Sequence, residues 1–77
     1  MNRMPRDIAQ DEERLGALAM QFRATPSKGK RRLIARAYSE TVDRLIQSGN
    51  WQDMPAPEDQ LPDAFMPSSF FEYWTSD

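Results

Sequence analysis

The chain has 77 residues, 39% of them hydrophobic, and a net charge of −2, so it forms one domain at most, around a small core. It contains neither histidine nor cysteine, which removes the commonest general base, the usual zinc ligands, thiol nucleophiles and disulfides, and which fits a cytoplasmic protein. Its apolar residues recur periodically, which argues against disorder of the whole chain, and no apolar run is long enough to cross a membrane.

A first amphipathic helix is predicted from Asp7 to Arg23. Asp7 is placed to cap its start, with Gln10 in the reciprocal position of a capping box, and Arg23 in the last turn suits the helix dipole. One narrow stripe of the helix wheel is apolar, formed by Ile8, Leu15, Leu18, Ala19 and Phe22. The break at residues 25–27 is short and contains a proline, so the next helix should lie antiparallel to the first.

A second helix is predicted from Pro26 to Ser48, with Gly49 as a left-handed terminator. Its apolar residues spread over roughly half of the helix wheel. They are Ile34, Ala35, Ala37, Tyr38, Thr41, Val42, Leu45 and Ile46. One neighbouring helix cannot cover so wide a face, so we expect a second partner, which is either the C-terminal tail or a second copy of the chain in a homodimer.

The tail, residues 50–77, carries four of the six prolines, which exclude a long helix, and six of the eight aromatic residues, which a solvated tail would lack. We expect an arm packed on the second helix, with Trp51, Phe65 and Phe70 filling the core. Ser69 and Glu72 are placed to cap a short third helical turn. The predicted fold is all-α, a helical hairpin (1–49) and an aromatic-rich acidic arm (50–77) in one structural domain.

The charge is divided between these two parts. All ten Lys and Arg precede Leu45, and six acidic residues in the same part of the chain leave it with a net charge of +4. The remainder of the chain carries six acidic residues and no base. A basic cluster crowds the start of the second helix, where cations oppose the helix dipole. Its members are Lys28, Lys30, Arg31, Arg32 and Arg36.

Three interpretations of this basic cluster remain open. It forms a solvated face supported by Arg36–Glu40 and Glu40–Arg44 pairs, or a docking surface for acidic residues of the tail or of another protein, or a phosphate-binding site that also uses helix-terminal amides. The Gly29-Lys30 pair is not a phosphate-binding loop, because the flanking glycine and hydroxyl residue are missing. No nucleophile, base and orienting group can be assembled, so we expect no enzyme, no cofactor and no metal site.

The leading prediction is a small non-enzymatic regulatory or inhibitory protein that binds a protein partner by occupying its surface. Size and split charge are typical of short regulatory proteins of phages and plasmids. Charge steering is assigned to Arg31, Arg32 and Arg36, and anchoring to Phe70, Phe71, Tyr73 and Trp74. The alternative is a nucleic-acid-binding regulator that uses the basic cluster for phosphates, and an antitoxin-like protein would combine both activities.

Overall fold

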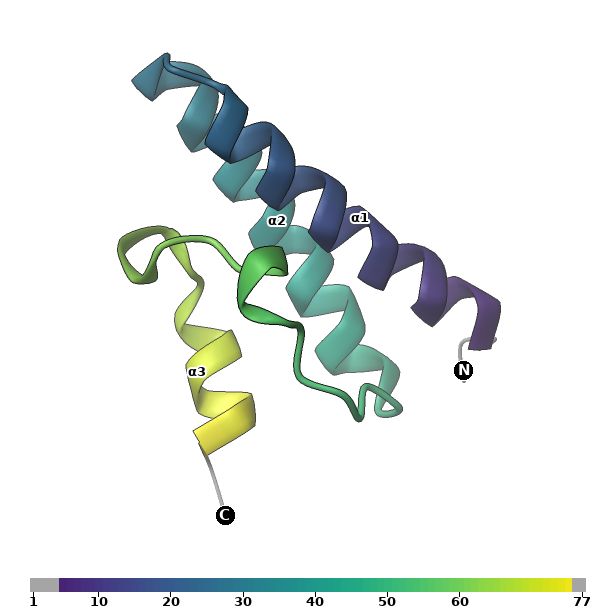
Figure 1. Ribbon diagram of the computed structural model, residues 1–77. Helices are drawn as coiled ribbons and strands as arrows, with labels where there is room; N and C mark the ends of the chain where they lie inside the picture. The colour runs from purple at the N-terminus through teal and green to yellow at the C-terminus, as the bar shows by residue number, and fades with distance from the viewer. Residues whose placement is uncertain (1–4, 76–77) are drawn as a thin grey trace.

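Two antiparallel helices build the hairpin that the sequence predicts (Figure 1). In the computed structural model, which describes residues 5–75, the elements in chain order are α1 (Pro5–Ala24), α2 (Lys28–Ser48), the 3-10 helices η1 (Pro57–Asp59) and η2 (Asp63–Phe65), and α3 (Ser68–Thr75). This part of the chain contains no strand, which confirms the all-α prediction. None of its helices is long and apolar enough to cross a membrane.

α1 begins two residues earlier than predicted, at Pro5. A proline is well tolerated at the first helical position, because the N–H that it lacks has no partner there in any helix. Asp7 therefore lies inside the first turn, where the positive end of the helix dipole favours its carboxylate. The predicted capping pair of Asp7 and Gln10 is wrong.

α2 begins two residues later than the predicted Pro26, because Ser27 sets its start. Ser27 has extended backbone angles (φ −76°, ψ 124°), and its hydroxyl oxygen accepts a hydrogen bond from the Lys30 amide at 3.4 Å. At the other end Gly49 is confirmed as the terminator. Its φ of 73° lies in the left-handed region, which glycine enters without steric cost.

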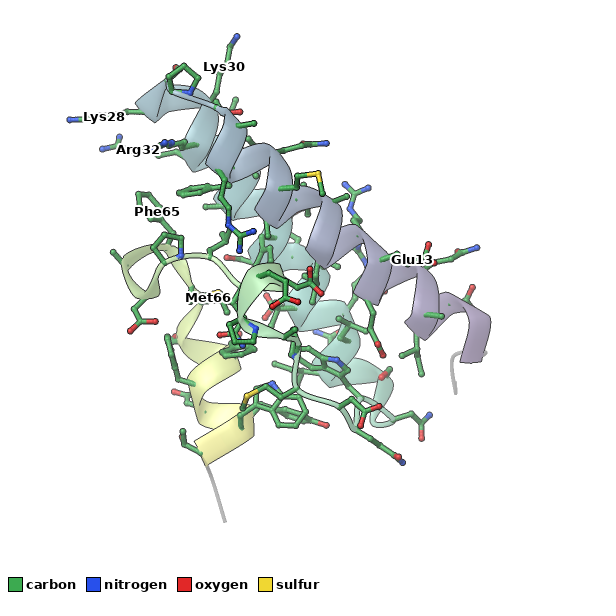
Figure 2. All side chains as sticks on the ribbon, in the orientation of Figure 1. Glu13, Lys28, Lys30, Arg32, Phe65 and Met66 are labelled. Atoms are coloured by element: carbon green, nitrogen blue, oxygen red, sulfur yellow. The ribbon has the colours of Figure 1, made fainter. Side chains whose placement is uncertain are left out.

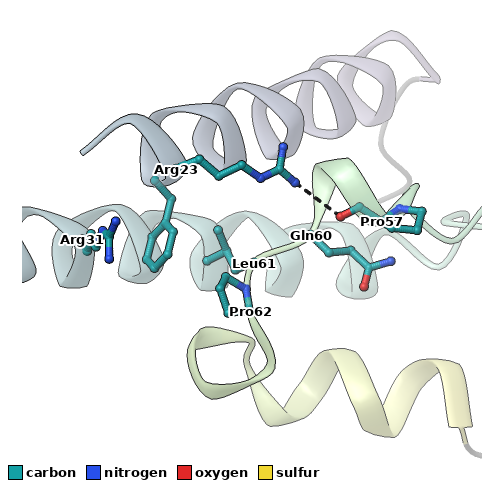
Figure 3. A pocket seen from close by; sticks show the side chains of 7 residues that line it. Arg23, Arg31, Pro57, Gln60, Leu61 and Pro62 are labelled. Carbon is teal, nitrogen blue, oxygen red and sulfur yellow. Dashed lines mark hydrogen bonds between the residues drawn. The ribbon is translucent and has the colours of Figure 1, made fainter. Parts of the chain in front are cut away.

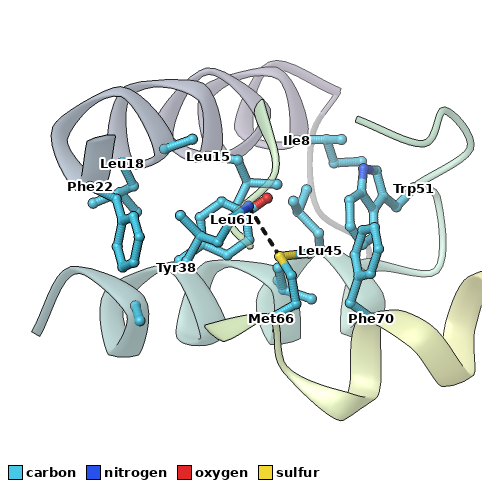
Figure 4. Packing of buried hydrophobic residues seen from close by; sticks show 13 residues of the cluster. Ile8, Leu15, Leu18, Phe22, Tyr38, Leu45, Trp51, Leu61, Met66 and Phe70 are labelled. Carbon is cyan, nitrogen blue, oxygen red and sulfur yellow. Dashed lines mark hydrogen bonds between the residues drawn. The ribbon is translucent and has the colours of Figure 1, made fainter. Parts of the chain in front are cut away.

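Both flanks of α2 are covered, as its wide apolar face predicts (Figure 4). α1 buries its predicted apolar stripe against one flank, and the arm that follows Gly49 returns over the other. The arm contributes four buried side chains, Trp51, Leu61, Met66 and Phe70. The second partner of α2 is thus a later part of the same chain, the arm together with α3.

Main-chain carbonyl groups fasten η1 to the hairpin. The Arg23 guanidinium donates to the carbonyl oxygens of Pro57 (3.5 Å) and of the residue after it, and the buried Tyr38 hydroxyl donates to the carbonyl oxygen of Asp59 (2.6 Å). Gly16 of α1 permits this close approach, since a Cβ atom there would lie 2.9 Å from Asp59 Oδ1. Two side chains of the hairpin therefore hold the arm by its backbone.

α3 confirms the predicted short third helix, but its start differs from the prediction. Ser69 lies within the first turn, and its hydroxyl donates to Asp43 Oδ1 of α2 at 3.0 Å. The predicted capping by Ser69 and Glu72 is therefore wrong. The hydroxyl instead ties α3 to the side of α2 that faces away from α1.

Candidate binding surface at the hairpin turn

Six basic residues gather where the hairpin turns. Between Arg14 and Glu40 the chain carries no acidic residue, so the end of α1 and the first turns of α2 are uniformly basic. We call six of these residues the basic end: Arg23, Lys28, Lys30, Arg31, Arg32 and Arg36. Figure 2 shows Lys28, Lys30 and Arg32 extending outward from the turn. α1 thus adds one base to the five that the sequence singles out.

The rest of the chain neutralises little of this charge. Among the described side chains one ion pair reaches the basic end, from Arg36 Nε to Glu40 Oε1 at 3.6 Å, and both partners are exposed. Arg44, predicted to pair with Glu40, turns instead to the buried Asp11 of α1 (Nη2 to Oδ1, 3.4 Å). No described carboxylate of the arm lies within ion-pair distance of the basic end. Its positive potential therefore faces solvent.

Two arginines of the basic end are oriented by neutral partners. Arg31 donates from Nε to the Thr25 carbonyl oxygen at 2.5 Å, and its guanidinium carbon lies 5.3 Å from the centre of the Phe22 ring. Arg23 is held by the two carbonyl groups of η1. Carbonyl oxygens and an aromatic face orient a guanidinium without cancelling its charge. Both arginines therefore keep a full positive charge in a fixed position.

These two arginines line a common hollow of about 490 Å³ between the hairpin and the arm (Figure 3). Arg31 lies at one end of it, and the guanidinium of Arg23 lies near the other end, beside Pro57. Leu61 and Pro62 lie between them and give the hollow an apolar floor. The hollow thus combines two cationic groups with an apolar middle.

A second hollow of about 200 Å³ continues from Arg31 toward the start of α2 and is lined by Lys28, Arg32 and Phe65. Phe65 is 36% exposed, and its ring meets that of Phe22 edge-on with the centroids 4.8 Å apart. The expectation that Phe65 fills the core is wrong, because η2 places it at the rim of the basic end. An aromatic face is therefore available beside the cations.

The predicted aromatic anchors lie on α3, beside the second half of α2 and away from the turn (Figure 1). Phe70 is 4% exposed, and Tyr73 stacks on the Trp51 ring (centroids 5.6 Å apart) and donates its hydroxyl to the Trp51 carbonyl oxygen at 2.5 Å. Trp74 meets the same indole edge-on at 5.2 Å. Phe71, at 38%, is the most exposed of the four rings. The structure does not join these aromatics to the basic end.

A third hollow, of about 180 Å³, has the opposite character. Its lining includes Glu12 of α1, Asp53 and Asp59 of the arm, and the Trp51 ring. Burial against the arm, together with the negative charge of Asp53, raises the pKa of Glu12. Among the described residues, no group of three or more potential ligands is arranged to hold a metal ion.

Part of the candidate surface escapes sequence reasoning. Arg23 has a readable signal, since it belongs to the same acid-free stretch as the five predicted bases. Leu61 and Pro62 have none, because their position beside Arg31 depends on how the arm folds back. No protein-family model, curated protein or solved structure matches this chain.

Proposed function

We propose that this chain is a non-enzymatic binding protein, a regulator or inhibitor that occupies an acidic surface of a partner protein through its basic end. One observation carries the proposal. The acidic arm folds back onto the hairpin, yet it offers carbonyl oxygens to Arg23 and no described carboxylate to the basic end, whose one ion pair among the described residues is the exposed Arg36–Glu40 pair. A chain with a net charge of −2 thus displays a concentrated positive potential at one end, which steers acidic partners into contact.

The aromatic residues that the sequence assigns to partner binding are not the ones that lie beside the basic end. Because Phe70, Tyr73 and Trp74 pack around Trp51, they stabilise the fold. Phe65, next to the bases, is the better placed ring for contact with a partner at this surface. Aromatic side chains commonly supply much of the binding energy of a protein–protein interface.

Nucleic-acid binding is the second candidate. It is favoured by the exposed Lys28, Lys30 and Arg32 around the first turn of α2, where backbone amides and cations can act together on phosphate. It is disfavoured by exposed acidic residues of the arm, since Glu58 and Asp63 directly flank residues that line the larger hollow. A continuous polyanion would meet these carboxylates, whereas a protein surface can avoid them.

Charge reversal at the turn tests the proposal. Arg32→Glu, on the exposed start of α2, should abolish capture of the partner from a lysate of the source cells. Arg14→Glu, at an arginine of α1 that is also exposed but lies outside the basic end, should leave the capture unchanged. Equal capture by both variants would refute the proposal. Loss of capture after nuclease treatment would favour the nucleic-acid candidate instead.

A further inference from the structure

We propose that the hollow between Arg23 and Arg31 binds an acidic–apolar peptide segment of the partner, with one carboxylate at each guanidinium and an apolar side chain on Leu61 and Pro62. The inference rests on the proposed function, because it assigns a specific site to the protein partner of the basic end. It differs from that function in naming the chemistry of the segment and its place between hairpin and arm.

Both guanidinium groups have donors left for a ligand. Arg31 uses Nε for the Thr25 carbonyl oxygen and Arg23 uses Nη2 for the carbonyls of η1, whereas their other nitrogens have no hydrogen-bond partner among the described residues. A guanidinium carries five N–H donors, so each arginine retains donors for a carboxylate, Arg31 at its two terminal nitrogens and Arg23 at Nε and Nη1. Since neighbouring groups already hold the two side chains, binding costs little further side-chain entropy.

The spacing of the two charges specifies the ligand. The guanidinium groups lie toward opposite ends of the hollow, with Arg31 held at Thr25 and Arg23 held at η1, so each presents its charge to a separate carboxylate (Figure 3). Leu61 and Pro62 between them offer apolar contacts and no hydrogen-bond donor from their side chains. A segment with two acidic side chains around an apolar one satisfies all three positions.

Gln60 favours a peptide over a nucleic acid in this hollow. Its side-chain nitrogen donates to the Pro55 carbonyl oxygen at 2.7 Å, which leaves the amide oxygen as an acceptor at the lining. A peptide backbone supplies N–H donors to such an acceptor, whereas a phosphodiester backbone supplies only acceptors. The hollow also continues past Arg31 to Lys28 and Arg32, so further acidic residues of the segment meet further cations.

Selection of random twelve-residue peptides on the full-length chain, by phage display at physiological salt, tests the inference without a known partner. The expected winners carry acidic residues on both sides of Leu, Ile or Phe. A synthetic winner should shift the Nε–H resonances of Arg23 and Arg31 and the Leu61 amide in ¹H–¹⁵N spectra. Selection without this pattern, or no selection at all, would overturn the inference.

Pro62→Glu is the matching variant, because Pro62 is exposed and lines the hollow. Its carbonyl oxygen accepts a hydrogen bond from the Phe65 amide at 2.8 Å, and this main-chain oxygen is retained in the variant. The added carboxylate should weaken binding of the winning peptide by about tenfold or more. Ala64→Glu, an exposed neighbour outside the lining, carries the same charge change and should bind normally. Equal binding by the two variants would show that the peptide does not use the hollow.

Two further outcomes separate this inference from the proposed function. If Arg32→Glu abolishes binding of the natural partner while Pro62→Glu leaves it intact, the basic end binds its partner elsewhere and the inference fails alone. If an oligothymidylate of twelve nucleotides displaces the winning peptide and binds more tightly, with a steep salt dependence, the site serves nucleic acid and both proposals fail.

Discussion

Arg44 illustrates what a sequence reveals about a single residue and what it conceals. Helical spacing correctly predicts the exposed Arg36–Glu40 pair, and by the same rule it predicts a Glu40–Arg44 pair. In the structure Arg44 instead reaches across the hairpin to Asp11. Asp11 is 7% exposed and lies beside the apolar stripe of α1. Local spacing cannot foresee this choice, because a partner on another helix competes with the partner one turn away.

Glu12 makes the stability of the fold depend on pH, which the sequence alone does not predict. Packing of the arm partly desolvates its carboxyl group and also brings the negative charge of Asp53 close to it, so the pKa of Glu12 in the folded state is raised above its ordinary value of 4.5. A raised carboxyl pKa means that the folded state prefers the protonated form. The associated stability is complete below pH 4.5 and is lost as the pH rises through the raised pKa.

Glu12→Gln should therefore raise the midpoint of thermal unfolding at pH 7, because the variant has no charge to desolvate. The gain should disappear near pH 4, where Glu12 itself becomes protonated. The side chain is exposed overall, so the gain is small. Glu13→Gln makes the same change at the adjacent exposed position and serves as the control. A gain of the same size at pH 4 and pH 7 would exclude an origin in the charge of Glu12.

α3 shows how far reasoning from the pattern of an element reaches. The wide apolar face of α2 predicts a second cover, and the aromatic content of the tail indicates what supplies it. The identity of the buried ring is a different matter. Phe70 and Phe71 are adjacent and chemically identical, and only the packing of α3 on α2 turns Phe70 inward and Phe71 outward.

This pair provides a matched test of α3. Phe70→Ala should lower the free energy of unfolding by about 3–5 kcal/mol, because it leaves a cavity beside Trp51 and Met66. Phe71→Ala should cost less than about 1 kcal/mol, because a surface position loses little buried area. Urea unfolding followed by Trp fluorescence measures both. Comparable losses would mean that α3 does not pack on α2 through one face.

At the scale of the molecule, the fold depends on the return of the arm. The sequence supports this conclusion through the excess apolar width of α2, and the structure adds how the arm is held. Its path over the hairpin, by way of two 3-10 helices, has no local signal beyond its prolines. The hollows between arm and hairpin therefore lie outside what the sequence predicts, although the bases that line them do not.

A fragment of residues 1–49 should consequently fail to fold as a stable hairpin. It retains α1 and α2 but loses Trp51, Leu61, Met66 and Phe70, which cover one flank of α2. Two helices alone bury too little apolar surface to offset chain entropy. Circular dichroism should show reduced helicity and no cooperative thermal transition, in contrast to the whole chain. A sharp transition near that of the whole chain would contradict this dependence.

The grip of Arg23 and Tyr38 on peptide carbonyls has a consequence for how this protein can diverge. Every amino acid supplies the same carbonyl oxygen, so substitutions at positions 57–59 leave these three hydrogen bonds in place. The exposed side chains of the arm can then change during evolution to suit new binding partners, while Arg23 and Tyr38 are conserved. We therefore expect homologues of this chain to conserve Arg23 and Tyr38 and to vary in the side chains at positions 57–59.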